Sequence, residues 1–148
     1  MFCDREGLRA AAEIYVENAF FVYASTRDPR DPPDVLPGSG AAVPVAHKAS
    51  PFDFTPEEWV GLGEVLQAAK AAWDERLAPD GYFLSWMCYV PSADDVVRMH
   101  AHLHVVPRFD DEPFRDRGGR TAIKDPANRR PDPLAPGSGR ARMFGRHE

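Results

Sequence analysis

Nine residues decide the fold, and they read Met99-His100-Ala101-His102-Leu103-His104-Val105-Val106-Pro107. They hold three of the chain's five histidines. Successive side chains of an extended strand point to opposite faces of its sheet. The three histidines would therefore share one face, while Ala101, Leu103 and Val105 would share the other. The sequence thus predicts a strand over residues 99–107, with an apolar face toward the core and a row of imidazoles opposite.

The imidazole row is the candidate active site, because histidine is the side chain whose unperturbed pKa lies near neutrality. Such a row packs poorly and risks burying unpaired polar atoms, so a merely solvated strand face is the less favoured interpretation. A single metal ion is another alternative. Strand geometry separates His100 from His104 by roughly 13 Å, whereas zinc binds nitrogen at about 2.0–2.1 Å. At most two of the three could share an ion, together with a ligand such as His47. Phosphorus chemistry fits better, since a central imidazole can be a nucleophile between neighbours whose N–H groups hold phosphate oxygens.

Residues 99–109 resemble the signature of the histidine triad (HIT) nucleotide hydrolases and transferases, which is His-x-His-x-His followed by two apolar residues. Two further segments stand in the order that this family has them, namely residues 36–47 and residues 52–58. The resemblance runs from about Phe2 to about Lys124, with a loop insertion between Ser25 and Pro37. It implies an α+β fold with an antiparallel, about five-stranded sheet, one long helix and a short N-terminal helix. It also implies a homodimer in which the sheets and helices of two subunits pack together.

The resemblance assigns a role to each histidine. His102 would attack the α-phosphorus of a nucleotide-like substrate and form a covalent nucleotidyl-imidazole that water then cleaves. His104 would bind the phosphoryl oxygens, and His100 would orient the neighbouring imidazole. Ser39 and Arg98 are the candidate substrate-binding residues, Arg98 because it precedes His100 by two positions on the same predicted strand face. This chemistry requires no metal or cofactor.

The chain departs from the family at three positions. Ser39 stands where a histidine is common, Val96 where a glutamine is expected, and Met87 where an asparagine is common. These departures bear on the substrate more than on the reaction type. They leave two alternatives: a ligand-binding or regulatory protein on a HIT scaffold that does not hydrolyse, or a repurposed HIT enzyme of secondary metabolism that uses the triad for metal binding or acid/base chemistry.

A zinc site is the metal alternative that the resemblance offers. Some HIT proteins hold a structural zinc on a Cys-x-x-Cys pair, a histidine like His47 and the first triad histidine. Here Cys3 would match the second cysteine, so that Cys3, His47 and His100 supply three ligands. Structural zinc sites usually have four, and the alternative for Cys3 is a small, partly buried apolar residue.

Composition sets the outer bounds. With 148 residues, of which 43% are hydrophobic, the chain suits one domain with its own core. The net charge of −5 argues against a nucleic-acid partner. No apolar run approaches the roughly 18 residues of a membrane span, and the first residues do not read as a secretory signal. Two cysteines far apart in sequence favour a reducing cytoplasm.

The clearest predicted element is a helix over residues 56–77, with Thr55 as N-cap, Pro56 at the first position and Glu58 completing a capping box. Strands are predicted over residues 19–23, 40–44, 82–89 and 99–107, and a short helix over residues 5–11. We predict a HIT-like domain over residues 1–124. Residues 125–148, which are rich in Pro, Gly and Arg, are predicted to be a flexible or partner-packing tail.

Overall fold

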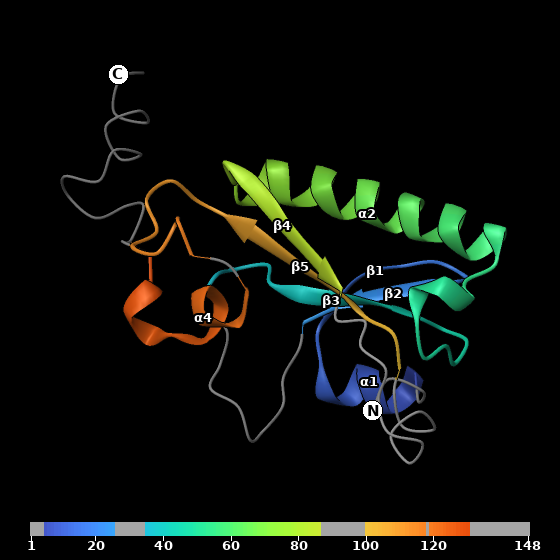
Figure 1. Cartoon of the computed structure of the whole chain (residues 1–148). Helices are drawn as coiled ribbons and strands as arrows, with labels where there is room; N and C mark the ends of the chain where they lie inside the picture. Colours follow the sequence, from blue (N-terminus) through green and yellow to red (C-terminus); the bar gives the residue numbers. More distant parts are fainter. Residues whose placement is uncertain (1–4, 26–34, 87–99, 118, 131–148) are drawn as a thin grey trace, which may run out of the picture.

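The computed structural model describes residues 5–25, 35–86, 100–117 and 119–130, which form an antiparallel sheet with helices on both sides (Figure 1). The sheet has five strands in the order β1-β2-β3-β5-β4. Its strands are β1 (Ile14–Glu17), β2 (Phe21–Ala24), β3 (Gly40–Pro44), β4 (Gly81–Trp86) and β5 (Leu103–Arg108). The helices are α1 (Arg5–Ala11), α2 (Pro56–Arg76), α4 (Gly119–Lys124) and the 3-10 turns η1 (Pro51–Asp53) and η2 (Pro126–Asn128). The predicted α+β class with one long helix and a short N-terminal helix is confirmed. None of the helices in these residues has the length and apolar character that a membrane span needs.

Helix α2 begins as its sequence predicts. The Thr55 side chain accepts a hydrogen bond from the Glu58 amide at 3.2 Å, and the Glu58 carboxylate accepts one from the Thr55 amide at 3.0 Å. This reciprocal pair satisfies two of the donors that a helix start leaves open. The helix ends at the cap residue Leu77, whose amide bonds to the Trp73 carbonyl. Of the apolar residues of α2, Leu62, Ala69 and Trp73 are buried, whereas Trp59 is 47% exposed.

The main core lies between α2 and one face of the sheet. Alternate residues of the triad segment enter it, because Ala101, Leu103 and Val105 are all buried in the same apolar cluster as Val65 and Trp73 of α2. The predicted alternation is therefore confirmed on its apolar side. Figure 1 shows α2 running along this side of the sheet, with α1 on the opposite side and α4 at the far end.

Two smaller apolar clusters cover the opposite face. One forms at α1 and contains Leu8, Val22 and Ala24. The other forms at α4 and contains Leu36, Val106, Phe109 and Ile123. His104 lies between them, because its β3 partner Ala41 pairs in turn with Ala24, while Val106 follows it by two residues on β5. Neither of the two small clusters therefore includes His104.

The strand that was predicted over residues 99–107 begins at Leu103, so His100 and His102 precede it. Strand β3 explains the late start. Its pairing with β5 ends at Ala42 opposite Leu103, and Pro44 has no amide to extend a ladder. The Ala101 amide donates instead to the carbonyl of Lys48 at 2.6 Å.

Other differences follow from local hydrogen bonding. The strand predicted over residues 19–23 runs over Phe21–Ala24, because the Asn18 side chain accepts from the amides of Phe20 and Phe21 at 2.9 and 2.8 Å and makes a turn there. Strand β1 and helix α4 were not predicted from the pattern. Arg98, Met87, Val96 and Cys3 lie outside the described residues.

The chain that follows β5 packs back on the domain as far as Arg130. The buried Asn128 side chain donates to the Ala122 carbonyl at 2.7 Å and accepts from the Phe114 amide at 2.6 Å. Arg130 donates to Asp111 at 2.7 Å and lies over the Phe109 ring. The domain boundary at residue 124 and the character of the tail stay predictions.

Candidate active site

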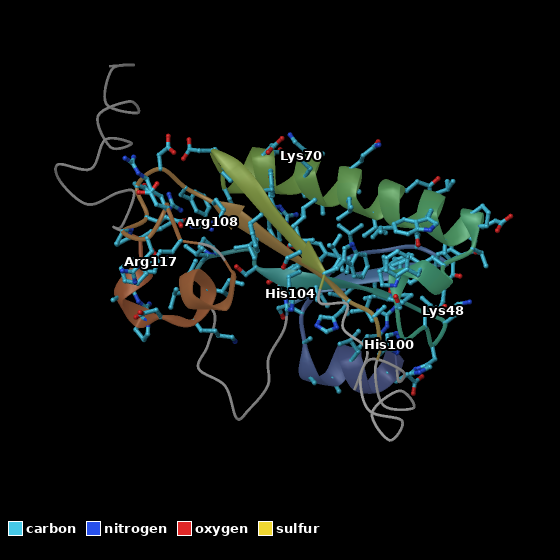
Figure 2. The ribbon with its side chains drawn as sticks, viewed as in Figure 1. Lys48, Lys70, His100, His104, Arg108 and Arg117 are labelled. Carbon is cyan, nitrogen blue, oxygen red and sulfur yellow. The ribbon has the colours of Figure 1, made fainter. Side chains whose placement is uncertain are left out.

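His104 is the one triad histidine that a strand holds directly. It pairs with Ala41 of β3 on one side and with Ser85 of β4 on the other. Paired residues in neighbouring antiparallel strands point to the same face, so the half-buried imidazole stands between a methyl group and a hydroxyl. Figure 2 shows His104 with His100 on the α1 side of the sheet.

His102 owes its orientation to the backbone. Its Nδ1 lies 3.0 Å from the carbonyl oxygen of His100. A carbonyl can only accept, so the proton of a neutral His102 ring is on Nδ1 and the lone pair is on Nε2. The ring centroid of His102 lies 4.8 Å from that of His104, with the rings at 80°. The two imidazole rings are therefore neighbours.

His100 is buried, with 6% of its surface exposed. Its Nε2 lies 2.9 Å from the carbonyl oxygen of Pro44, to which it donates. The exposed His47 packs edge-on against it, with ring centroids 5.0 Å apart. Burial lowers the pKa of His100 below its usual value, the nearby His47 and His102 rings add to this, and the Pro44 carbonyl opposes it. The ring is therefore neutral at pH 7, with its single proton on Nε2.

Ser39 is placed at the start of β3, close to the sheet core. The residue is 4% exposed, and its hydroxyl donates to the Leu36 carbonyl at 2.7 Å. The preceding Gly38 has a φ of 81°, a conformation that glycine adopts without strain, and its carbonyl accepts from the Tyr23 hydroxyl. The role of Ser39 in substrate binding stays a prediction, and so does that of Arg98.

The described residues do not assemble a metal site. Among them, no group of three or more histidine, cysteine, aspartate or glutamate side chains could hold an ion. His47 and His100 do lie together, but the third residue of the zinc alternative, Cys3, falls outside these residues.

The sequence does not identify Lys48 and Glu58 as parts of the site. The Lys48 carbonyl accepts from the Ala101 amide at 2.6 Å, and the Lys48 ammonium lies 3.5 Å from the carboxylate of Glu58. The sequence places Glu58 in a capping box and Lys48 directly after His47, and these are the local features that could have drawn attention to them. Nothing in the spacing indicated that Lys48 would contact the triad segment or that Glu58 would pair with Lys48.

No family model matches the chain, and no curated protein does. Solved structures do match it. A HIT family protein from Bacillus anthracis aligns with a TM-score of 0.59 and 21% identity, over 80% of this chain and 78% of its own. A zinc-bound histidine triad family protein from Mycobacterium smegmatis aligns with a TM-score of 0.58 and 24% identity, over 80% and 81%.

The chain has the histidine triad fold. A hypothetical histidine triad nucleotide-binding protein from Sulfolobus tokodaii, at 17% identity and a TM-score of 0.55, aligns over 74% of this chain and 68% of its own. At these identities the likeness is one of fold, and it is the HIT scaffold that positions the three histidines described above.

Proposed function

We propose that this HIT-fold protein is a nucleotide-type phosphoester or phosphoramidate hydrolase, or a nucleotidyl transferase, with His102 as nucleophile. One observation carries the proposal: the hydrogen bond from His102 Nδ1 to the His100 carbonyl puts the lone pair of the neutral ring on Nε2, and this ring neighbours that of His104. A neutral imidazole whose tautomer is fixed in this way carries its lone pair on the nitrogen that would attack.

The reaction has two displacement steps. The Nε2 lone pair attacks the α-phosphorus, a P–N bond forms, and the bond from phosphorus to the leaving group breaks, with its electron pair going to the leaving group, which takes up a proton. The His102 ring then carries a positive charge, and its Nδ1–H bond to the His100 carbonyl stabilises that charge. Water next attacks phosphorus and gives up a proton to the solvent. The P–N bond breaks with its electron pair returning to Nε2, so that the nucleotide leaves and the neutral His102 ring is restored. A transferase would use another acceptor in place of water.

His104 and His100 have different proposed roles. His104 donates to the phosphoryl oxygens, whose negative charge is held best by donors already in place. His100 acts through its backbone carbonyl rather than its ring, since that carbonyl accepts from His102. Its buried neutral ring, tied to the Pro44 carbonyl, fixes where that backbone lies.

We also propose a homodimer, with a small nucleotide-like molecule as the substrate and the cytoplasm as the compartment. Among the described strands, β4 lies at an edge of the sheet and exposes half of its Leu84 side chain. A strand in that position is a ready surface for a second chain, which supports the dimer. Analytical ultracentrifugation tests this proposal, with Leu84→Lys expected to raise the monomer fraction. A wild-type protein that sediments as a monomer at every concentration would refute the dimer.

The second candidate is a HIT scaffold that binds a ligand without hydrolysing it. The position of Ser39 favours it, because the hydroxyl is buried and donates to the Leu36 carbonyl. A donor already engaged in this way is not available to a phosphate oxygen without breaking that bond.

A substrate screen with intact-mass detection separates the two candidates. Nucleoside phosphoramidates, dinucleoside polyphosphates and nucleotidyl sulfates are each mixed with the wild-type protein and with His102→Ala, and quenched in acid-free buffer. A mass increase of one nucleotidyl group on the wild type alone supports the enzyme. Tight binding without an adduct or a product for any of the three classes supports the second candidate and removes the first.

A further inference from the structure

The peptide group that joins His100 to Ala101 is hydrogen-bonded both to the proposed nucleophile and to Lys48. Its carbonyl oxygen accepts from Nδ1 of His102 at 3.0 Å, and its N–H donates to the Lys48 carbonyl at 2.6 Å. Because a trans peptide is planar, its N–H and C=O point in opposite directions. Whatever fixes the direction of the N–H therefore also aims the carbonyl at the His102 ring.

Lys48 is itself held in place by a buried carboxylate. Its ammonium lies 3.5 Å from Oε1 of Glu58, which is 5% exposed. The same Oε1 accepts from the Thr55 amide at 3.0 Å, at the start of α2. Burial acts to raise the pKa of Glu58, but the hydrogen bonds from Thr55 and the charge of Lys48 outweigh it and hold that pKa below its usual range. The carboxylate is therefore ionised, and among the described residues Lys48 is the cation that pairs with it.

The second carboxylate oxygen adds to the dependence on Lys48. Within the part of the chain that the structure describes, Oε2 of Glu58 is buried and has no hydrogen-bond partner. A buried carboxylate with so few donors is costly to leave without a cation. The Glu58 carboxylate therefore depends on the Lys48 ammonium to stay buried and ionised. Figure 2 shows Lys48 at the end of the sheet where His100 lies.

We infer that Lys48 and Glu58 are positioning residues for His102, and that they act through the peptide group between His100 and Ala101. The first turn of α2 fixes Glu58, Glu58 fixes Lys48, the Lys48 carbonyl orients the peptide, and the peptide carbonyl holds the proton of His102 on Nδ1. Hydrogen bonds in such a chain polarise one another. The consequence for catalysis rests on the proposed function, whereas the consequence for the His102 tautomer does not.

Two variants break the chain of contacts without removing the helix cap. Glu58→Gln retains a side chain that can complete a capping box but removes the negative charge that Lys48 meets. Lys48→Met retains the aliphatic stem and the backbone carbonyl but removes the ammonium. Glu57→Gln is the matched control, because Glu57 lies in the same turn and is exposed.

Nitrogen NMR of the histidine rings is the deciding measurement, with thermal melting and the rate of adduct formation recorded beside it. In the wild type and in Glu57→Gln, we expect the His102 proton on Nδ1. In Glu58→Gln and Lys48→Met, we expect a larger fraction of the Nε2–H form. We also expect an adduct rate that falls about tenfold with KM unchanged, inside the roughly hundredfold that a 1 Å misplacement can cost.

The outcomes separate this inference from the proposed function. A lower melting temperature with a wild-type His102 tautomer in both variants would mean that the pair only anchors the loop, and the inference would be wrong. A shifted tautomer in a protein that forms no adduct with any substrate would keep the inference and refute the proposed function. If Lys48→Met does not fold, Glu58→Gln and its tautomer alone decide.

Discussion

The two faces of the triad segment differ although alternate residues of one short stretch of chain form them. On the α2 face, Leu103 and Val105 are 4% and 3% exposed and pack in the main core. On the opposite face, His102 and His104 are half-buried, outside both smaller apolar clusters. Successive side chains therefore differ in what they contact: those on one face pack the sheet against α2, and those on the other are imidazoles. Substitutions on the two faces should accordingly separate stability from activity.

The largest effect is expected on the α2 face. Leu103→Asp would place a carboxylate in the apolar cluster, and burying an unpaired charge is among the few changes that cost more than about 4 kcal/mol. We expect the variant to be unfolded at 25 °C, as measured by circular dichroism and chemical denaturation. A folded and active Leu103→Asp would show that the register of β5 has been misassigned.

The opposite face should behave in the reverse way. His102→Ala removes the proposed nucleophile, so turnover of whichever substrate the screen identifies should fall by roughly a thousandfold or more. The lost hydrogen bond to the His100 carbonyl should lower the free energy of unfolding by only about 1 kcal/mol. Steady-state kinetics and denaturation of the same preparation measure both quantities. Wild-type turnover in His102→Ala would exclude it as nucleophile.

How far the sequence predicts this molecule depends on whether a signal is local. The capping box at Thr55 and Glu58 and the alternation of Leu103 and Val105 are local, and both were predicted correctly. The predicted start of β5 was wrong, because it depends on the missing amide of Pro44 and on the carbonyl of Lys48, both more than fifty positions upstream. The contact of Lys48 with Glu58 was missed for the same reason: no sequence period connects a loop lysine with the first turn of a helix and with a distant peptide group.

A smaller effect is expected at Ser39, the residue directly before β3. Ser39→Ala removes the donor to the Leu36 carbonyl in a buried position, which should cost about 1–2 kcal/mol of stability. If the hydroxyl only ties this turn, KM and kcat should stay within about twofold of the wild type. A KM raised by tenfold or more, with the melting curve unchanged, would instead establish Ser39 as a substrate-binding residue.

The smallest effect concerns the buried His100. Because burial lowers its pKa in the folded protein, the unfolded chain binds more protons than the folded one as the pH falls through about 6.5, the usual histidine value. The stability that His100 contributes is therefore present above about pH 6.5 and is lost as the pH falls below it.

Denaturation at about pH 7.5 and about pH 5.5 measures the loss, and His100→Gln is the reference. His47 and His102, which face His100, are present in both proteins. We expect the wild type to lose more stability than His100→Gln over this range. An equal loss in the two proteins would show that the His100 ring is as free to take up a proton in the fold as in the unfolded chain, and that it does not serve as a neutral support for the backbone that orients His102.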